Sequence, residues 1–340
     1  MTLTRRHLIA GIAALAPVAC VARPLRAQDT RIGAINRMDP GLDAVIDPDA
    51  PIEVLGTGYG WAEGPVWVPD GGYLLFTDVP GNRIWRWTPG AGAPVPFLDP
   101  SGPSPIPAGV REAGANGLAL DRQGRLLMAG SGTRAIERLD LKTRIRTILA
   151  NRFDGKRFNS CNDLIEGRDG SIYFTDPPYG LADGDQSPLK EQAANGVYQL
   201  APDGTVSRID ATVKRPNGIA LSPDQRTLYV TQSDPDVPEL YAYSRQVDGS
   251  FGERRVLGNF RAGVAAGKPG LPDGMKVAAT GHLFMTGPGG VLVFTPDGRH
   301  LGTIGTGKAI ANCALAPNGW LYLTSSDMVA RVRTRVRPAS

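Results

Sequence analysis

Six segments of this 340-residue chain repeat one pattern, and this repeat limits the possible folds more than any other feature. Each segment opens on an acidic or amide residue, continues with a short apolar run, turns, and returns along a second apolar run. We call the six opening residues the starter residues: Glu63, Asn116, Asn162, Asn217, Asp273 and Asn312. They are 53, 46, 55, 56 and 39 residues apart, a spacing typical of the blades of a β-propeller. The sequence therefore predicts an all-β protein, a six-bladed β-propeller.

Composition also indicates short strands joined by tight turns. The chain contains 43 glycines and 29 prolines, and helical periodicity is almost absent after the first 27 residues. Short runs of Val, Ile, Leu, Tyr and Phe are separated by Gly, Pro and Asp, a pattern that favours strands. A pair of β-sandwiches or a β-helix would also contain such strands. Neither requires the polar residue, the turn and the second strand to keep one phase through six repeats, so the propeller is favoured.

The N-terminus is a segment of a different kind. Arg5 and Arg6 precede an apolar run that is rich in alanine and glycine. This run is shorter than the roughly 20 residues that a membrane-spanning helix needs. We therefore expect residues 1–27 to be a twin-arginine-type signal peptide, recognised by the twin-arginine export machinery, and residues 28–340 to be one propeller domain in the periplasm. A retained N-terminal helix and a lipoprotein attached through Cys20 are the alternatives.

Charge and histidine content exclude several classes of function. The expected signal peptide holds four arginines, and the rest of the chain contains 33 basic and 33 acidic residues. A net charge near zero predicts no binding to nucleic acid, and none to membranes beyond export. Only His282 and His300 remain, both in turn-like contexts. They argue against a serine hydrolase with a histidine base and against a zinc site built on imidazoles.

The starter residues are expected to meet at one mouth of a central channel, because the first strand of each propeller blade lines that channel. Two of them are carboxylates and four are amides, so all six present oxygen. Such a mixed oxygen set selects a hard cation and favours Ca²⁺, with Mg²⁺, Mn²⁺ and Zn²⁺ as other possibilities. The Asn-Gly pairs at Asn116 and Asn217 are, taken singly, strong turn formers. Their common phase with the other starter residues is what favours a binding site.

Two long loops and two cysteines can be placed by the same reasoning. The second strand of a blade returns to the mouth where the first strand begins, so the loops over residues 177–195 and 100–115 reach the mouth of the starter residues. Both are expected to wall a pocket there. Cys161 and Cys313 adjoin the starter residues of opposite blades, and a disulfide needs Cα atoms within about 7 Å. We therefore predict two free thiols.

Several long motifs make the chain resemble the SMP-30/gluconolactonase family, in particular its bacterial gluconolactonase-like branch. The resemblance covers nearly all of residues 53–325. The segments that carry it are EGPVWVPDGGYLLFTDVPGNRIWRW, NGLALDRQGRLL, GKRFNSCNDLIEGRDGSIYFTDPPYGL, RPNGIALSPDQRTLYVT, LPDGMKV and GPGGVLVFTPDGRHLG. This resemblance implies a propeller that hydrolyses a sugar lactone or a related cyclic ester with Ca²⁺ or another divalent ion.

The resemblance also implies roles for individual residues. Glu63, Asn162, Asn217 and Asp273 match the metal-site residues of the family, and Asp273 matches the usual catalytic base. Positions recurrent in the family give the expected substrate-binding residues: Asn116, Asn162 and Asn312.

Two departures from the family pattern bear on the pocket wall. The branch usually carries a Glu-His-Gly motif in the second strand of blade 2, where this chain has Ala129, Gly130 and Ser131. Cys161 stands where proline often precedes the metal-site asparagine. Both departures concern the identity of the substrate more than the cation.

The expected chemistry is metal-assisted ester hydrolysis. The cation would polarise the lactone carbonyl and stabilise the developing oxyanion, while Asp273 activates a water. The same site could support phosphotriester hydrolysis or a sugar-acid lyase reaction, because a fold does not fix a function. A non-catalytic periplasmic propeller that binds sugar and uses Ca²⁺ for stability is the other alternative.

Overall fold

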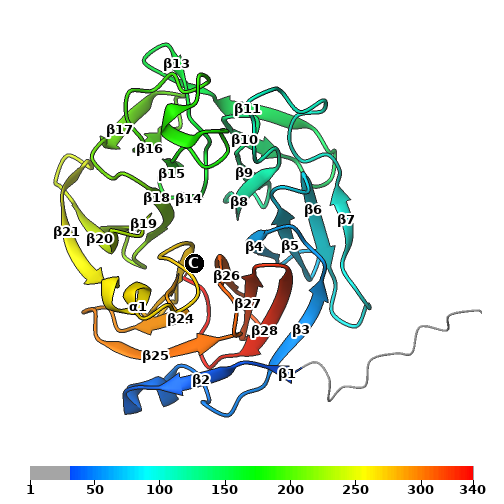
Figure 1. Ribbon diagram of the computed structural model, residues 1–340, viewed down its shortest axis with the longest axis vertical. Coiled ribbons are helices and arrows are strands. Elements are labelled where there is room, and N and C mark those ends of the chain that lie inside the picture. The colour runs from blue at the N-terminus through cyan, green and yellow to red at the C-terminus, as the bar shows by residue number, and fades with distance from the viewer. Residues whose placement is uncertain (1–30, 340) are drawn as a thin grey trace, which may run out of the picture.

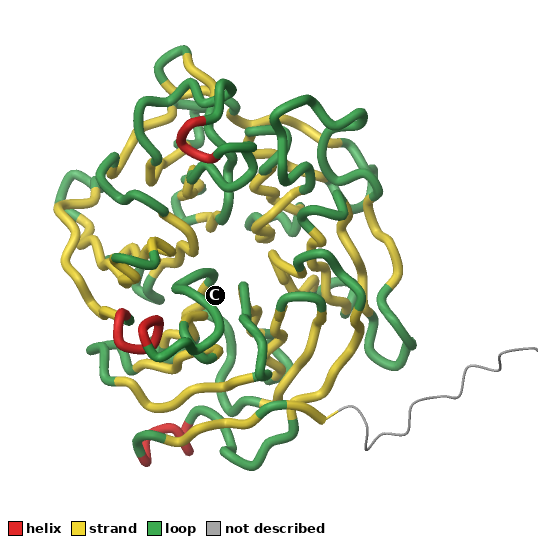
Figure 2. The backbone as a smooth tube through the Cα atoms, viewed as in Figure 1, coloured by secondary structure: helices red, strands yellow, loops and turns green. Residues whose placement is uncertain are grey.

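A computed structural model describes residues 31–339, and the expected signal peptide lies outside the described residues. Six antiparallel sheets stand radially around a central axis, one after another along the chain (Figure 1). The predicted six-bladed β-propeller is confirmed. Within residues 31–339, helix is confined to three short pieces (Figure 2), and none of them is long and apolar enough to cross a membrane.

Each blade begins with the strand nearest the axis, and the starter residues number the blades from 1 to 6. Blade 1 contains β4 (Ala62–Val68), β5 (Tyr73–Asp78), β6 (Arg83–Trp87) and β7 (Val95–Leu98). Blade 2 contains β8 (Ala115–Leu120), β9 (Leu126–Gly130), β10 (Ala135–Leu139) and β11 (Arg146–Ala150). Blade 3 contains β14 (Leu164–Glu166), β15 (Ile172–Asp176), β16 (Gly196–Leu200) and β17 (Val206–Asp210).

The second half of the ring repeats this order. Blade 4 contains β18 (Pro216–Leu221), β19 (Thr227–Asp234), β20 (Val237–Arg245) and β21 (Phe251–Asn259). Blade 5 contains β22 (Met275–Val277), β23 (Leu283–Gly287), β24 (Gly290–Phe294) and β25 (His300–Gly305). Blade 6 contains β26 (Asn312–Leu315), β27 (Trp320–Ser325) and β28 (Met328–Arg333). Outside the blades lie a hairpin of β12 (Arg152–Phe153) and β13 (Lys156–Arg157), the 3-10 helices η2 (Pro40–Ala44) and η3 (Gly184–Gln186), and helix α1 (Arg261–Ala265).

The N-terminal part of the described chain closes the ring. Strand β3 (Ile52–Thr57) pairs with β28 and supplies the fourth strand of blade 6, and β1 (Arg31–Ile32) pairs with β3 as a fifth strand. Strand β2 (Ala34–Arg37) adds a fifth strand to blade 5 by pairing with β25. The first and last strands of the described residues thus lie in one sheet, and separating blade 6 from blade 1 requires breaking the β3–β28 ladder.

Six hydrophobic clusters hold the blades together, one between each pair of neighbours. The second strand of each blade is buried on both faces, and its successive side chains point to opposite neighbours. In β5, Leu75 packs against blade 2 and Phe76 against blade 6. In β15, Tyr173 packs against blade 4 and Phe174 against blade 2. This two-sided burial explains why the second strands read as unbroken apolar runs rather than alternating ones.

Cys161 and Cys313 are buried and form no disulfide, as predicted. Cys161 belongs to the cluster between blades 2 and 3, whereas Cys313 belongs to the cluster between blades 5 and 6. Burial raises the pKa of the Cys161 thiol, which keeps that thiol protonated and unreactive.

Candidate active site

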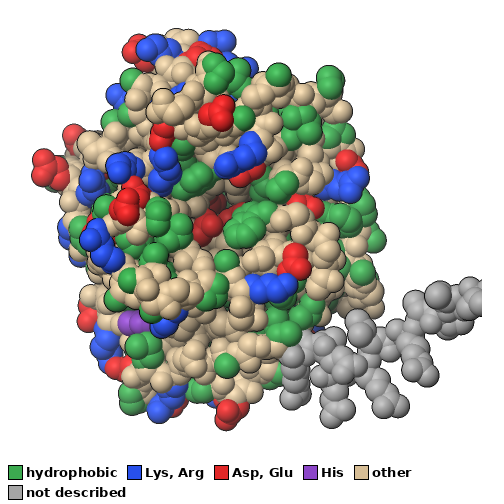
Figure 3. Space-filling model, in the orientation of Figure 1, with side chains coloured by type: hydrophobic (Ala, Val, Ile, Leu, Met, Phe, Trp, Pro, Cys, Tyr) green, Lys and Arg blue, Asp and Glu red, His purple; other side chains and the backbone are tan. Residues whose placement is uncertain are grey.

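The starter residues meet at one mouth of the channel, as the repeat predicts. Five of them line a single cavity of about 450 Å³: Glu63, Asn116, Asn162, Asn217 and Asp273. Figure 3 looks onto the face that carries this opening and shows acidic side chains at the bottom of a central hollow. Asn312 is buried at the start of β26 and does not line this cavity.

Glycines next to the starter residues let neighbouring blades approach closely. A Cβ atom added to Gly218 would lie 2.2 Å from the carbonyl oxygen of Asp273, and one added to Gly117 would lie 2.8 Å from that of Asn162. Gly117 and Gly218 both lie within strands, β8 and β18. The Asn-Gly pairs are therefore not hairpin turns here. They form a ring in which one blade's glycine leaves room for the next blade's starter residue.

Threonines in the second strands fix this ring through hydrogen bonds between blades. The hydroxyl of Thr77 donates to the carbonyl oxygen of Asn116 over 3.0 Å. Thr175 donates in the same way to Asn217 over 2.6 Å, and the Thr231 hydroxyl donates to the carbonyl oxygen of the next starter residue over 2.8 Å. These bonds tie the backbone of a starter residue to the blade before it. Glu63, Asn116 and Asn217 lie within strands, whereas Asn162 and Asp273 lie two residues before β14 and β22.

Three amide oxygens at this mouth are buried and have no hydrogen-bond partner: Asn116 Oδ1, Asn162 Oδ1 and Asn217 Oδ1. The orientation of Asn217 is set by its own amide nitrogen, which donates to Ser233 Oγ over 2.8 Å. Ser233 in turn donates to the carbonyl oxygen of Pro272. Buried acceptors without a donor are costly, and such oxygens beside carboxylates are the ligands that hard cations take. The residues therefore fit a bound divalent cation.

The acidic starter residues carry strongly perturbed pKa values. Glu63 is only 3% exposed, and burial together with the nearby charge of Asp163 raises its pKa to about 8. Burial also raises the pKa of Asp163. Asp273 keeps part of its surface in the cavity, and burial followed by the charges of Glu63 and Asp163 raises its pKa well above the ordinary value. Carboxyl groups this close favour either shared protons or a cation.

A polar layer lies just below the ring of starter residues. The amide nitrogen of Asn312 donates to Glu63 Oε2 over 3.1 Å and lies 3.4 Å from Asp163 Oδ2. Lys276 Nζ lies 3.4 Å from Asn312 Oδ1 and also lines a second cavity of about 620 Å³ farther along the inner strands. Asn312 thus orients a carboxylate from below, and its expected contact with substrate stays a prediction.

Within residues 31–339, no group of three or more His, Cys, Asp and Glu side chains is arranged to hold a metal ion. A cation at the mouth would therefore be held by two carboxylates together with amide oxygens. Such a set suits Ca²⁺ or Mg²⁺ better than a softer ion.

The two predicted loops do wall the cavity. Glu112, from the 100–115 loop, and Tyr179, from the 177–195 loop, both line it. The loops pair with each other: Arg111 N–H donates to the Gly180 carbonyl over 2.8 Å, and Val110 and Leu181 form an antiparallel bridge. Each wall is therefore braced by the other.

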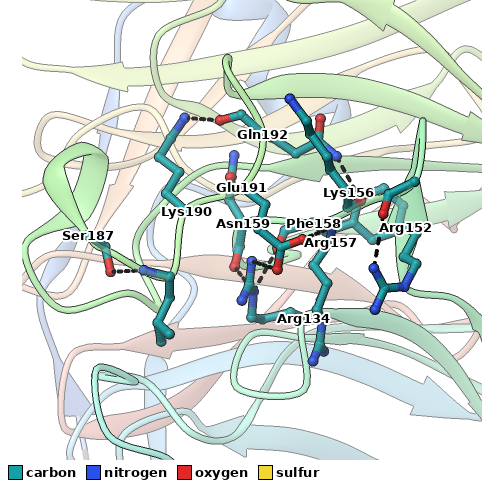
Figure 4. Close-up of polar contacts among 12 residues, drawn as sticks. Arg134, Arg152, Lys156, Arg157, Phe158, Asn159, Ser187, Lys190, Glu191 and Gln192 are labelled. Carbon is teal, nitrogen blue, oxygen red and sulfur yellow. Dashed lines mark hydrogen bonds and ion pairs between the residues drawn. The ribbon is translucent and has the colours of Figure 1, made fainter.

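Farther out, the 177–195 loop is anchored to the β12–β13 hairpin (Figure 4). The amide of Gln192 donates to the carbonyl oxygens of Phe153 and Lys156 over 3.0 and 2.9 Å. Lys190 Nζ donates to the Gln192 carbonyl over 2.7 Å. Gln192 is buried, so these bonds are shielded from water and hold the loop against blade 3.

The altered motif in blade 2 is explained by the same loop. Ser131 is buried and does not line the cavity. Gly180 packs on it so closely that an added Cβ would lie 2.4 Å from Ser131 Oγ and 2.7 Å from Ser160 Cβ. Ser160 Oγ also accepts a hydrogen bond from Gly180 N–H over 2.8 Å. The 177–195 loop thus occupies the space above a small residue at position 131.

Sequence reasoning missed several residues of the site. Asp163 follows a starter residue at the position that glycine holds after Glu63, Asn116 and Asn217, so the broken pattern was a usable signal. Lys276, which lies three residues after Asp273, offered no such signal.

The comparisons with known proteins agree with this architecture. The model of the family described as the SMP-30/Gluconolactonase/LRE-like region matches residues 61–327. The chain belongs to the SMP-30/gluconolactonase family. It is 46% identical to a gluconolactonase of Zymomonas mobilis subsp. mobilis over 310 residues, which are 89% of this chain and 87% of that protein.

The chain is also similar to two further proteins whose names denote lactone hydrolases. The solved structure of a gluconolactonase from Xanthomonas campestris is 32% identical, with a TM-score of 0.76, over 92% of this chain and all of that one. A pentonolactonase of Haloferax volcanii is 27% identical over 251 residues, or 73% of this chain and 75% of that protein.

Proposed function

We propose that this protein is a metal-dependent lactonase that hydrolyses a sugar lactone resembling gluconolactone, or a related cyclic ester. One observation carries the proposal. Two carboxylate residues and three asparagines line one cavity of about 450 Å³, and the amide oxygens of the three asparagines have no hydrogen-bond partner. The similarity to proteins named gluconolactonase and pentonolactonase supports a sugar lactone as the substrate.

Burial and hydrogen bonding distinguish the expected roles of the residues that line the cavity. Glu63, Asn162, Asn217 and Asp273 would hold the cation, with Ca²⁺ the ion that this oxygen set favours. When bound, such a cation supplies a Lewis acid that polarises the lactone carbonyl. Asp273 is the base that takes a proton from water, because its side chain keeps contact with the cavity while Glu63 is almost fully covered. Asn116 lines the cavity and orients substrate.

The test compares Asp273→Asn with Asp297→Asn. Asp297 also lies between proline and glycine, but its side chain is exposed, so this variant is the matched control. With Ca²⁺ present, we expect Asp273→Asn to lower kcat for gluconolactone by about 10²- to 10⁴-fold, while Asp297→Asn leaves it unchanged. Gluconolactone, an aryl ester and a phosphotriester are assayed with and without EDTA. Near-normal turnover by a folded Asp273→Asn variant would refute the assignment of Asp273 as the base. Binding of gluconolactone by the wild-type protein without hydrolysis would favour the non-catalytic propeller.

Export by the twin-arginine machinery to the periplasm is also part of the proposal. It rests on Arg5 and Arg6 before the apolar run. Replacing both by lysine should retain the full-length precursor inside the cell, as measured by fractionation and immunoblotting. Unchanged export of that variant would contradict this route.

A further inference from the structure

The lining of the cavity combines apolar and polar side chains. Leu271, Ile310 and Trp61 contribute apolar surface. Glu112 and Tyr179, from the two paired loops, add polar groups beyond the ring of starter residues. A ligand that fits this lining must combine a carbon surface with hydrogen-bonding groups. A polyhydroxylated ring has both a carbon surface and hydrogen-bonding hydroxyl groups, whereas a simple aliphatic lactone has no hydroxyl groups.

The Tyr179 hydroxyl lies near the Ser233 side chain and the carboxyl group of Asp273, but it forms no well-aligned hydrogen bond within the described residues. It is buried from solvent. A buried hydroxyl without a partner costs free energy, so phenylalanine would serve better if this position only filled space. Its backbone is fixed instead: the carbonyl of Tyr179 accepts from the Arg111 side chain, and the next residue pairs with the Arg111 backbone.

Glu112 is held beside this hydroxyl by the same pairing of loops. Its backbone N–H donates to Gly180 over 3.3 Å, and its carboxylate has one described side-chain partner, Arg111 Nη2 at 3.3 Å. The Glu112 side chain is 22% exposed, and Glu112 lines the cavity. Burial raises its pKa to about 6, so at neutral pH most of the carboxyl groups remain ionised acceptors.

We propose that Glu112 and Tyr179 form a hydroxyl-recognition wall that makes this site selective for polyhydroxylated lactones over lactones without hydroxyl groups. The inference rests on the proposed lactonase function and names its substrate class more closely. The carboxylate accepts from a sugar hydroxyl, and the tyrosine donates to or accepts from another. A substrate without hydroxyls leaves both groups unpaired, and buried unpaired polar groups give strong discrimination.

The experiment compares two substrates and two analogues that resist hydrolysis. Wild type, Glu112→Gln and Tyr179→Phe are assayed for kcat/KM on gluconolactone and on δ-valerolactone. Binding of gluconolactam and δ-valerolactam is measured by calorimetry on the same Ca²⁺-loaded proteins. Tyr73→Phe and Glu253→Gln are the matched controls, because both residues lie away from the cavity and have no hydrogen-bonded side chain.

We expect each cavity variant to lower kcat/KM for gluconolactone by about tenfold or more, and to weaken gluconolactam binding in parallel. The loss on gluconolactone should exceed the loss on δ-valerolactone at least fivefold, and the controls should match wild type. Equal losses on both substrates, or no loss, would overturn the inference and leave the lactonase function standing. If the wild type hydrolyses neither lactone, the lactonase function fails, and the lactam measurements still decide whether the wall selects hydroxyl groups.

Discussion

Gly218 offers the sharpest test of how the ring of starter residues holds the site. Gly218 is in β18 of blade 4, and its backbone faces Asp273 of blade 5. Replacing it by alanine adds one methyl group that touches no ligand. A Cβ there would lie 2.2 Å from the carbonyl oxygen of Asp273 and 2.8 Å from the Cα of Gly274.

The size of the effect follows from these distances. Non-bonded heavy atoms are best separated by roughly 3.5 Å, so the backbone of Asp273 must withdraw by about 1 Å. The withdrawal strains the 2.8 Å hydrogen bond from Thr231 Oγ1 to the Asp273 carbonyl. Overpacking of this kind typically costs about 1–3 kcal/mol of unfolding free energy. A displacement of about 1 Å at a catalytic group can also cost about 10²-fold in rate.

Gly302→Ala separates stability from positioning. A Cβ on Gly302, in β25 at the outer side of blade 5, would lie 2.6 Å from the backbone oxygen of Asn36, far from the cavity. Both variants should lose stability in urea melts, but only Gly218→Ala should lose kcat/KM for gluconolactone beyond tenfold. A folded Gly218→Ala variant with activity within threefold of Gly302→Ala would refute the argument that glycine at this position places Asp273.

Two other outcomes are expected. Because folding raises the pKa of Glu63 from 4.5 to about 8, the folded state holds this proton more tightly, and Glu63 alone should lower the unfolding free energy of metal-free protein by about 1 kcal/mol per pH unit between pH 5 and 8. Saturating Ca²⁺ should remove the contribution of Glu63 to this slope in denaturant melts. It should leave the contributions of groups that would not hold the cation, such as Asp176 and Glu112, whose pKa values burial raises to about 7 and about 6. A metal-free slope that Ca²⁺ leaves unchanged would contradict this. Gly180→Ala should displace the 177–195 loop and lower kcat/KM about tenfold, because its Cβ would lie 2.4 Å from Ser131 Oγ. Gly92→Ala, which adds a methyl group into open space, is the control, and equal activity of the two variants would show that the loop adapts.

The blade repeat could be predicted because its signal is local and recurs. The polar start, the turn and the second apolar strand all lie within about 20 residues of one another, and six copies reinforce the phase. Each second strand is buried on both faces, so its apolar run is long enough to recognise. Tyr173 and Phe174 in β15 are one such pair, packed against opposite neighbours.

The closure of the ring could not be predicted by the same means. Strand β3 pairs with β28 across nearly the whole sequence, with Ile52 opposite Val332. No repeat links these segments, because β3 lies outside the six units. The pairing of the wall loops was missed for a related reason: Arg111 and Gly180 meet through backbone atoms, which leave little trace in residue types.

Asp273 shows how far a dipeptide can be interpreted without its neighbours. Gly204, after Asp203, has φ near +89° and open space around it, so glycine is used there for a turn. Gly274, after Asp273, is not in the left-handed region, but a Cβ there would lie 2.0 Å from the Asn312 side chain. Gly204 is thus required for its left-handed backbone conformation, whereas Gly274 is required because a side chain there would collide with Asn312. Only the phase of Asp273 within the repeat separates the two in sequence, because the neighbour that needs the space lies in the next blade.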